Sequence, residues 1–150
     1  MINAVLHSVD KFDVSKIANC NVLLVDDCEL NARLLAILLK QNGIQVQGAK
    51  NGREAIKKIQ LNNFDIVLMD LEMPVMNGYE AIAVIRQQLR NTIPVIAMTA
   101  HTRPGEKAKC LQAGMNGYIT KPVDEELIFS TIYKLIHNTA DAFANSILNE

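Results

Sequence analysis

Cysteine is scarce in this sequence, and a long hydrophobic run is missing. The three cysteines, Cys20, Cys28 and Cys110, are odd in number and widely spaced, so they form neither a disulfide framework nor a zinc motif. Free thiols are typical of a reducing compartment, and we therefore expect a cytoplasmic protein. No apolar run is long enough to span a bilayer, and the N-terminus lacks a secretory signal, so no membrane insertion is expected.

An excess of charge of one sign is also missing. The chain carries 15 Lys and Arg against 16 Asp and Glu, for a net charge of -1, so we expect no nucleic-acid partner. Its 150 residues, 49% hydrophobic and 21% charged, suit one soluble domain with a substantial core. We expect this domain over residues 21–137, with an N-terminal extension over 1–20 and a C-terminal extension over 138–150.

Short apolar runs alternate along the chain with segments of helical spacing. Strands are expected at Val22–Val25, Ile44–Ala49, Ile66–Met69, Ile93–Met98 and Tyr118–Ile119. Helices are expected over Cys28–Gln41, Asn51–Asn62, Gly78–Leu89 and Pro104–Ala113 and from Asp124 onward. Strands that alternate with helices need right-handed crossovers. The sequence therefore predicts an α/β fold, a doubly wound, flavodoxin-like parallel sheet of five strands in the order 2-1-3-4-5 with helices on both faces.

Helical spacing also predicts which side chains face the core. In the helix after the first strand these are Leu30, Leu34, Ile37 and Leu38. In the last helix they are Leu127, Ile128, Thr131, Ile132 and Leu135. Apolar spacing continues to residue 147 and predicts that the last helix runs past His137, its stripe covered by Met1–Phe12 or by a second chain in a homodimer. A frayed tail is the alternative.

Acidic residues stand at the ends of two predicted strands. Asp70 ends the apolar run that begins at Ile66, and Asp26 and Asp27 follow the first strand. An ionised carboxylate is costly to bury alone, so we expect Asp70 at the carboxyl edge of the sheet, where open α/β sheets bind ligands. The strand order brings the three carboxylates together, which requires a retained proton or a bound cation. Ligands that are all hard oxygens favour Mg²⁺ or Mn²⁺ over zinc.

Two further strand ends carry groups that suit a phosphoryl group. Thr99 offers a hydroxyl, and Lys121 offers an ammonium. Each residue has an ordinary alternative: the aspartates could cap a helix, the threonine could cap a loop, and the lysine could be solvated. Because these groups occur together at four strand ends of one predicted sheet, a phosphoryl site is the better interpretation.

Several strings of residues resemble one known family. LLVDD, IVLMDLEMPVMNGYEA, PVIAMTA and GYITKP are similar to the motifs of response-regulator receiver domains, the CheY-like domains of two-component signalling. The residues between and around these motifs look most like those of receivers in hybrid sensor histidine kinases, and the resemblance covers about residues 21–137. It implies that Asp70 is the phospho-acceptor, that Asp27 binds Mg²⁺ directly and Asp26 through water, and that the Glu72 backbone carbonyl completes the metal shell.

The same resemblance implies roles for the other residues and for partners. Thr99 and Lys121 would contact the phosphoryl oxygens, Tyr118 would be the aromatic switch residue, and Glu72 and His101 would tune the lifetime of the phosphoryl group. The donor would be a histidine kinase or a histidine phosphotransfer protein. A downstream protein would bind the face formed by the helix near 104–113, the strand at 118–119 and the last helix. Without the resemblance, Tyr118 is an edge-strand aromatic, and Glu72 and His101 are surface side chains.

Three classes of function remain to be compared. The leading one is a stand-alone receiver, a phospho-acceptor that switches protein contacts or relays phosphate and is not an enzyme. An unphosphorylated adaptor with this fold is disfavoured because the acidic, hydroxyl and amine set is intact. An aspartyl-phosphate phosphatase is disfavoured because no substrate cap is visible, although Glu72 stands where such enzymes keep a second acid. No glycine-rich loop follows the first strand, which disfavours a flavin or dinucleotide site.

Overall fold

The computed structural model describes residues 13–137. In chain order the elements are η1 (Val14–Ile17), β1 (Asn21–Val25), α2 (Glu29–Gln41), β2 (Gln45–Ala49), α3 (Gly52–Leu61), β3 (Ile66–Asp70), α4 (Gly78–Ala83), η2 (Val84–Gln88), β4 (Val95–Thr99), α5 (Glu106–Ala113), β5 (Gly117–Thr120) and α6 (Glu125–His137). No helix within this described part is long and apolar enough to cross a membrane. The predictions for Met1–Phe12 and for a helix beyond residue 137 fall outside the described residues.

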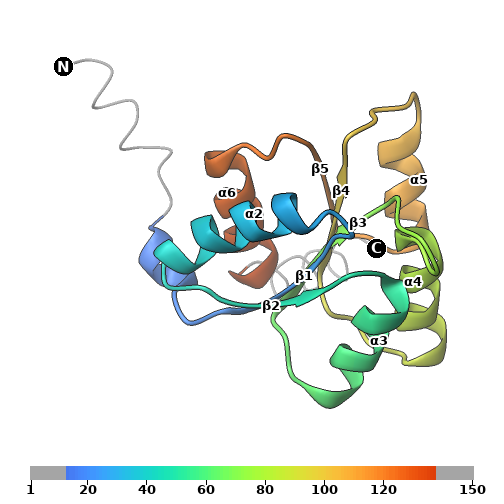
Figure 1. Ribbon diagram of the computed structural model, residues 1–150, viewed down its shortest axis with the longest axis horizontal. Helices are drawn as coiled ribbons and strands as arrows, with labels where there is room; N and C mark the ends of the chain where they lie inside the picture. Colours follow the sequence, from blue (N-terminus) through green and yellow to red (C-terminus); the bar gives the residue numbers. More distant parts are fainter. Residues whose placement is uncertain (1–12, 138–150) are drawn as a thin grey trace, which may run out of the picture.

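The five strands form one parallel sheet in the order β2-β1-β3-β4-β5, so the predicted fold is confirmed. Helices α2 and α6, with η1, lie on one face, and α3, α4 and α5 lie on the other (Figure 1). Successive side chains of β1 point to opposite faces, as the pleat requires. Val22 and Leu24 accordingly pack under α2 and α6, and Leu23 and Val25 pack in the core on the other side.

The predicted buried face of α2 is wrong at three of its four residues. Leu30, Leu34 and Ile37 are 65%, 58% and 48% exposed, whereas Leu38 lies partly buried against the core. The helix also buries Leu39 completely and Leu35 partly, and neither was predicted. The physical reason is that α2 carries apolar side chains around most of its circumference, so helical spacing fits more than one face. The sheet can cover only one of them.

The last helix follows its predicted face more closely. Ile128 and Ile132 are fully buried in α6, whereas Leu127 is 47% exposed, contrary to the prediction. Leu127 is the third residue of α6, and the two residues that follow it, Ile128 and Phe129, take the buried positions at this end of the helix.

The segment before β1 packs against the end of α6. Asp13 caps the 3₁₀ turn η1 by accepting a hydrogen bond from the Ser15 backbone N–H, 3.0 Å long. Ile17 is 1% exposed in the core under α6. Nε2 of His137 lies 3.0 Å from the Lys16 carbonyl oxygen. The two ends of the described chain are therefore neighbours, at the end of the sheet where the strands begin.

A π-helical turn interrupts the helix predicted over Gly78–Leu89. The α-helix ends at Ala83, and η2 continues it in wider turns. Arg86 in η2 donates hydrogen bonds to the carbonyls of Gly114 (3.0 Å) and Asn91 (2.8 Å) and to Oδ1 of Asn116 (2.9 Å). This one side chain therefore ties the end of η2 to the turn between α5 and β5.

Candidate functional site

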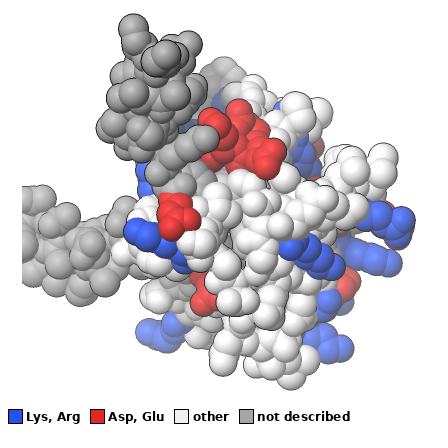
Figure 2. Space-filling model, turned by 90° about the vertical axis from the view of Figure 1, so that its left-hand side faces the viewer, with Lys and Arg blue, Asp and Glu red and all other residues white. Residues whose placement is uncertain are grey.

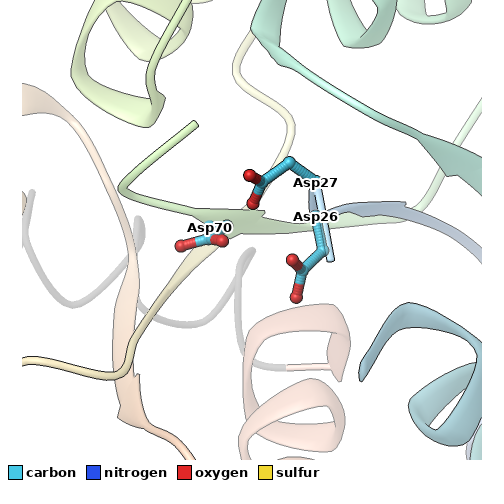
Figure 3. Close-up of side chains that lie close together, drawn as sticks. All are labelled: Asp26, Asp27 and Asp70. Carbon is cyan, nitrogen blue, oxygen red and sulfur yellow. The ribbon is translucent and has the colours of Figure 1, made fainter. Parts of the chain in front are cut away.

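Three carboxylates meet at the carboxyl edge of the sheet. Asp26 and Asp27 follow β1, and Asp70 is the last residue of the neighbouring strand β3. One oxygen from each lies within 4.8 Å of the others (Figure 3). Asp26 and Asp70 are 5% and 6% exposed, and Asp27 is exposed. The parallel register of β1 and β3 puts these strand ends side by side, as the sequence predicts.

Lys121 joins the acidic cluster from the loop that follows β5. Its Nζ lies 2.8 Å from Oδ2 of Asp26 and 3.3 Å from Oδ2 of Asp70, so it donates to both carboxylates. The Lys121–Pro122 peptide is cis. A single ammonium therefore faces more than one carboxylate, which leaves the cluster with net negative charge.

Burial governs the electrostatics of Asp70. Desolvation raises the pKa of its carboxyl group, and the nearby charge of Asp26 adds to the effect, while the Glu72 backbone N–H and Lys121 oppose it. Burial opposes the charged form of Lys121, but its hydrogen bonds and the charges of both aspartates outweigh burial and raise its pKa. The ammonium is therefore held in its charged form beside Asp70.

The donor atoms of this cluster suit a hard divalent cation. All three groups offer carboxylate oxygens, and Mg²⁺ is commonly bound through one or two carboxylates while it keeps several waters. Oδ1 of Asp26 already accepts the Cys28 backbone N–H at 2.9 Å, and its Oδ2 accepts from Lys121. Asp27 is exposed, which leaves room for ligands from solvent. The residues present therefore fit Mg²⁺ or Mn²⁺.

Thr99 ends β4, the next strand along the edge. Its side chain is 1% exposed, and its hydroxyl donates to the His101 carbonyl at 3.0 Å and accepts the His101 backbone N–H at 3.1 Å. The hydroxyl is thus engaged with its own loop rather than with Asp70. The structure brings Asp70 and Lys121 into contact and places Thr99 on the adjacent strand, turned toward the backbone.

Glu72 has a partner that the sequence did not indicate. Its Oε1 lies 3.2 Å from Nη2 of Arg103, in an ion pair whose two side chains are 54% and 67% exposed. This pair links the loop that follows Asp70 to the loop that follows β4. His101 was singled out with Glu72 from the sequence, and its backbone N–H and carbonyl are hydrogen-bonded to the Thr99 hydroxyl. No sequence signal identifies Arg103, because the contact depends on two loop conformations.

Tyr118 of β5 is partly buried, and its hydroxyl donates to Oε1 of Glu106 at 3.3 Å. The hydroxyl of Tyr79 in α4 donates to Oε2 of the same carboxylate, also at 3.3 Å. Sequence reasoning found Tyr118 but missed Glu106 and Tyr79. The three residues are separated by 12 and 27 positions, and only the fold brings them together.

An apolar surface begins next to the acidic cluster. The exposed side chains Leu30, Leu34 and Ile37 form one stripe along α2, which starts directly after Asp27 and Cys28. A hollow of about 520 Å³ lies beside this stripe and reaches the acidic edge; its lining includes Asp26, Asn31, Leu34, Leu35, Leu38, Met98, Ala100, Lys121, Pro122 and Val123. The face on the left of Figure 1 is mostly uncharged, with acidic groups most prominent near its top and Lys and Arg side chains around its rim (Figure 2).

The fold and the acidic edge together define a CheY-like, doubly wound α/β domain. The model of the family described as "Response regulator receiver domain" matches residues 22–133 of this chain. This match covers more than half of the chain, and the chain belongs to the response-regulator receiver domain family.

Curated relatives and solved structures agree with this assignment. The chain is 42% identical over 127 residues to Sensor histidine kinase RcsC of Escherichia coli (strain K12), a match that covers 85% of this chain and 13% of that protein. It resembles the structure of the Francisella response regulator 1452 receiver domain, with a TM-score of 0.76, 30% identity, and 81% and 99% of the two chains covered.

A second solved structure contains a partner. It is the co-crystal structure of the Saccharomyces cerevisiae histidine phosphotransfer signaling protein Ypd1 and the receiver domain of its downstream response regulator Ssk1. The match has a TM-score of 0.75 at 30% identity and covers 82% of this chain and 92% of that chain. The curated relatives are much longer: the chain spans 15% of the first of them and 5% of another.

Proposed function

We propose that this domain accepts a phosphoryl group on Asp70 from a phosphohistidine of a histidine kinase or a histidine phosphotransfer protein. One observation carries the proposal: Asp70 is a nearly buried carboxylate at the sheet edge, with the Lys121 ammonium 3.3 Å away and two more carboxylates beside it. A fixed cation next to the attacking oxygen offsets the negative charge that a transferring phosphoryl group brings. The domain would act in this way alone or within a longer chain.

The transfer forms one bond and breaks another. A carboxylate oxygen of Asp70 bonds to phosphorus while the bond from phosphorus to the histidine nitrogen breaks, and the nitrogen keeps the electron pair. Lys121 stays charged and contacts the phosphoryl oxygens. Asp26, Asp27 and Asp70 would hold Mg²⁺ or Mn²⁺, with the Glu72 backbone carbonyl as a further ligand. When bound, the cation neutralises charge on the phosphoryl oxygens.

Phosphorylation would then change the surface used for output. A phosphoryl group on Asp70 adds negative charge and acceptor oxygens, so the Thr99 hydroxyl would leave the His101 backbone to donate to one of them. Tyr118 would turn inward into the space left behind. The face formed by α5, β5 and α6 would shift between two populations and so bind a downstream protein, or the phosphoryl group would pass on to another relay partner.

The exposed stripe of α2 suits the donor of the phosphoryl group. A phosphohistidine can reach Asp70 only if its protein covers the edge of the sheet beside Asp70. Leu30, Leu34 and Ile37 form a stripe that begins at that edge and runs along α2, and an exposed apolar stripe of this kind is typical of a protein interface. We take a histidine phosphotransfer protein as the occupant, because a receiver of 30% identity has been solved with such a protein.

Incubation with acetyl phosphate and Mg²⁺, followed by intact mass spectrometry, tests the phospho-acceptor. We expect the wild-type chain to gain one phosphoryl group, and neither Asp70→Asn nor wild type without a divalent cation to gain it. The matched control is Asp124→Asn, which changes an exposed acid outside the cluster and should be labelled like wild type. A chain that stays unmodified with Mg²⁺ present would favour the unphosphorylated adaptor instead.

Glu72 and His101 would set how long the phosphoryl group survives, because they flank the path of attacking water. The ion pair between Glu72 and Arg103 supports this role for Glu72. The half-life of phosphorylated Asp70 should therefore change in Glu72→Ala and in His101→Ala, and unchanged half-lives in both would reject the idea. The domain would promote only its own phosphotransfer and dephosphorylation, and its free cysteines would suit the cytoplasm.

A further inference from the structure

We infer that Glu106 is a positioning residue that holds Tyr118 in its resting place by accepting hydrogen bonds from Tyr118 and Tyr79 at once. The inference rests on the proposed role of Asp70 and concerns what phosphorylation has to overcome. The two tyrosine hydroxyls each lie 3.3 Å from a different oxygen of the same carboxylate. The contact joins three elements, since Glu106 is the first residue of α5, Tyr79 lies in α4 and Tyr118 in β5.

Tyr79 is the fixed member of this group. Its hydroxyl also lies 3.4 Å from Sγ of the buried Cys110, and Nζ of Lys109 lies over its ring, 4.5 Å from the centroid. Glu106 is therefore anchored by a tyrosine that is itself held by two neighbours on α5. Tyr118 is joined to the anchored carboxylate through its hydroxyl.

The protonation of both phenols supports this arrangement. Burial raises the pKa of both tyrosines above the ordinary value. The contact with Cys110 and then the charge of Glu106 add to the effect at Tyr79. The charge of Glu106 adds to it at Tyr118, where a contact with Thr102 acts in the opposite direction. Both hydroxyls therefore keep their protons at neutral pH and can donate to the carboxylate. A carboxylate only accepts, so two donors satisfy it without competition.

The shared carboxylate keeps the cost of switching small. When Tyr118 turns inward, Glu106 loses one donor but keeps the hydrogen bond from Tyr79, so no carboxylate is left without a partner. The movement also requires Thr99 to leave the His101 backbone. Glu106 thus favours the resting position of Tyr118 but still allows Tyr118 to turn inward.

The loss of this hydrogen bond should be measurable. At 3.3 Å the contact is long for an O–H donor to oxygen, so its contribution lies at the low end for a bond to a charged group. We expect Glu106→Gln to lower the beryllofluoride concentration at which Tyr118 switches by about threefold, since a neutral amide oxygen accepts less strongly. The matched control is Glu125→Gln, which removes the same charge from the first turn of α6.

Nuclear magnetic resonance of the full chain with ¹³C at the tyrosine Cζ atoms provides the readout. The chain has 3 tyrosines, so Tyr79→Phe, Tyr118→Phe and Tyr133→Phe assign every signal. Without phosphoryl analogue, Glu106→Gln should shift the Tyr79 and Tyr118 signals, and Glu125→Gln should shift neither. Beryllofluoride with Mg²⁺ is then titrated into each protein, and the midpoint of the Tyr118 change is compared.

Each outcome decides the inference. Shifted resting signals with a lower midpoint in Glu106→Gln support it, and Glu106→Asp should return the midpoint only part of the way because its carboxylate is shorter. Unchanged resting signals overturn it, and so does an unchanged midpoint with shifted signals, which would make the contact merely structural. A wild-type protein that ignores beryllofluoride would instead contradict the proposed function, while the resting signals would still decide whether Glu106 holds Tyr118.

Discussion

Helices α2 and α3 lie on opposite faces of the same sheet, and they use their apolar residues differently. In α3, Ala55 and Ile59 are buried against the sheet, and Leu61, at the end of the helix, is a single exposed apolar side chain. In α2, Leu39 is buried, but a stripe spanning residues 30–37 is exposed as well. The apolar face of α3 thus matches what the sheet can cover, whereas α2 carries more apolar side chains than the sheet can cover.

The difference separates residues that stabilise the fold from residues that are free to bind. Scattered exposed apolar side chains are normal on protein surfaces, whereas a contiguous exposed stripe is typical of a binding site. The stripe of α2 also starts at the acidic edge, whereas Leu61 ends α3 shortly before β3 begins. Four experiments test this difference between the two layers of helices.

Two buried thiols report on the two layers separately. Cys20 packs in the layer of α2 and α6, and Cys110 packs in the layer of α3, α4 and α5, while Cys28 is exposed. Burial, aided by the charge of Asp65, raises the pKa of Cys20 to about 12, and burial raises the pKa of Cys110. We expect iodoacetamide at neutral pH to label Cys28 about a thousandfold faster or more, because the others react only after the domain opens.

Peptide mapping over time measures the three rates. Equal rates for Cys20 and Cys110 are expected if the domain opens as one cooperative unit. A layer that opened alone would expose its own thiol earlier. That result would make the two layers separate units of stability rather than halves of one core.

Two leucines of α2 should differ sharply in their effect on stability. Leu39→Ala empties a fully buried position and should lower the free energy of unfolding by about 3 kcal/mol. Leu34→Ala removes a side chain that is 58% exposed and should change the free energy by no more than about 0.5 kcal/mol. Urea unfolding measures both. Similar losses in the two variants would mean that the stripe contributes to folding after all.

The layer of α3, α4 and α5 depends on a polar clamp as well as on its apolar core. Arg86→Ala removes three hydrogen bonds, two to the turn between α5 and β5 and one to the Asn91 carbonyl, and should lower the free energy of unfolding by about 2 kcal/mol. Arg86→Lys should recover only part of this loss, because an ammonium lacks the planar fork of a guanidinium. Gln87→Ala, at the exposed neighbouring position, is the control in the same unfolding assay.

Transfer from a protein donor should distinguish the two exposed apolar surfaces. Leu34→Ala should lower the rate constant for phosphotransfer from a phosphorylated histidine phosphotransfer protein about tenfold, the size typical of a truncated interface anchor. Leu61→Ala, an exposed leucine on the other layer, should leave it unchanged. Both variants should react with acetyl phosphate like wild type, because that donor needs no protein surface. A loss with acetyl phosphate would indicate damage to the site instead.

The sheet and the acidic edge were predictable because their signals are local. An apolar run that ends in an aspartate marks both a buried strand and the edge where it emerges, as at Asp70. The alternation of strands and helices then determined which strand ends lie together. This reasoning found Asp26, Asp27 and Lys121, which the structure brings into contact or close to Asp70.

The remaining features depend on contacts that no local pattern encodes. The buried face of α2 was predicted wrongly because apolar residues surround the helix, so only the position of the sheet decides which of them are covered. The pairing of Glu72 with Arg103 depends on two loops. The carboxylate shared by Tyr79 and Tyr118 requires three packed elements. Long-range contacts between polar side chains therefore could not be predicted from the sequence.

The contact between His137 and Lys16 has a consequence for how this domain can be joined to others. Nε2 of His137 lies 3.0 Å from the Lys16 carbonyl, at the end of the sheet where the strands begin. Fluorescent proteins or tethers fused before Asp13 or after His137 would thus leave from the same pole, opposite the carboxylates. A short linker between residues 13 and 137 would also give a circular permutant, in which new termini opened in a loop away from the carboxyl edge would leave the docking side clear.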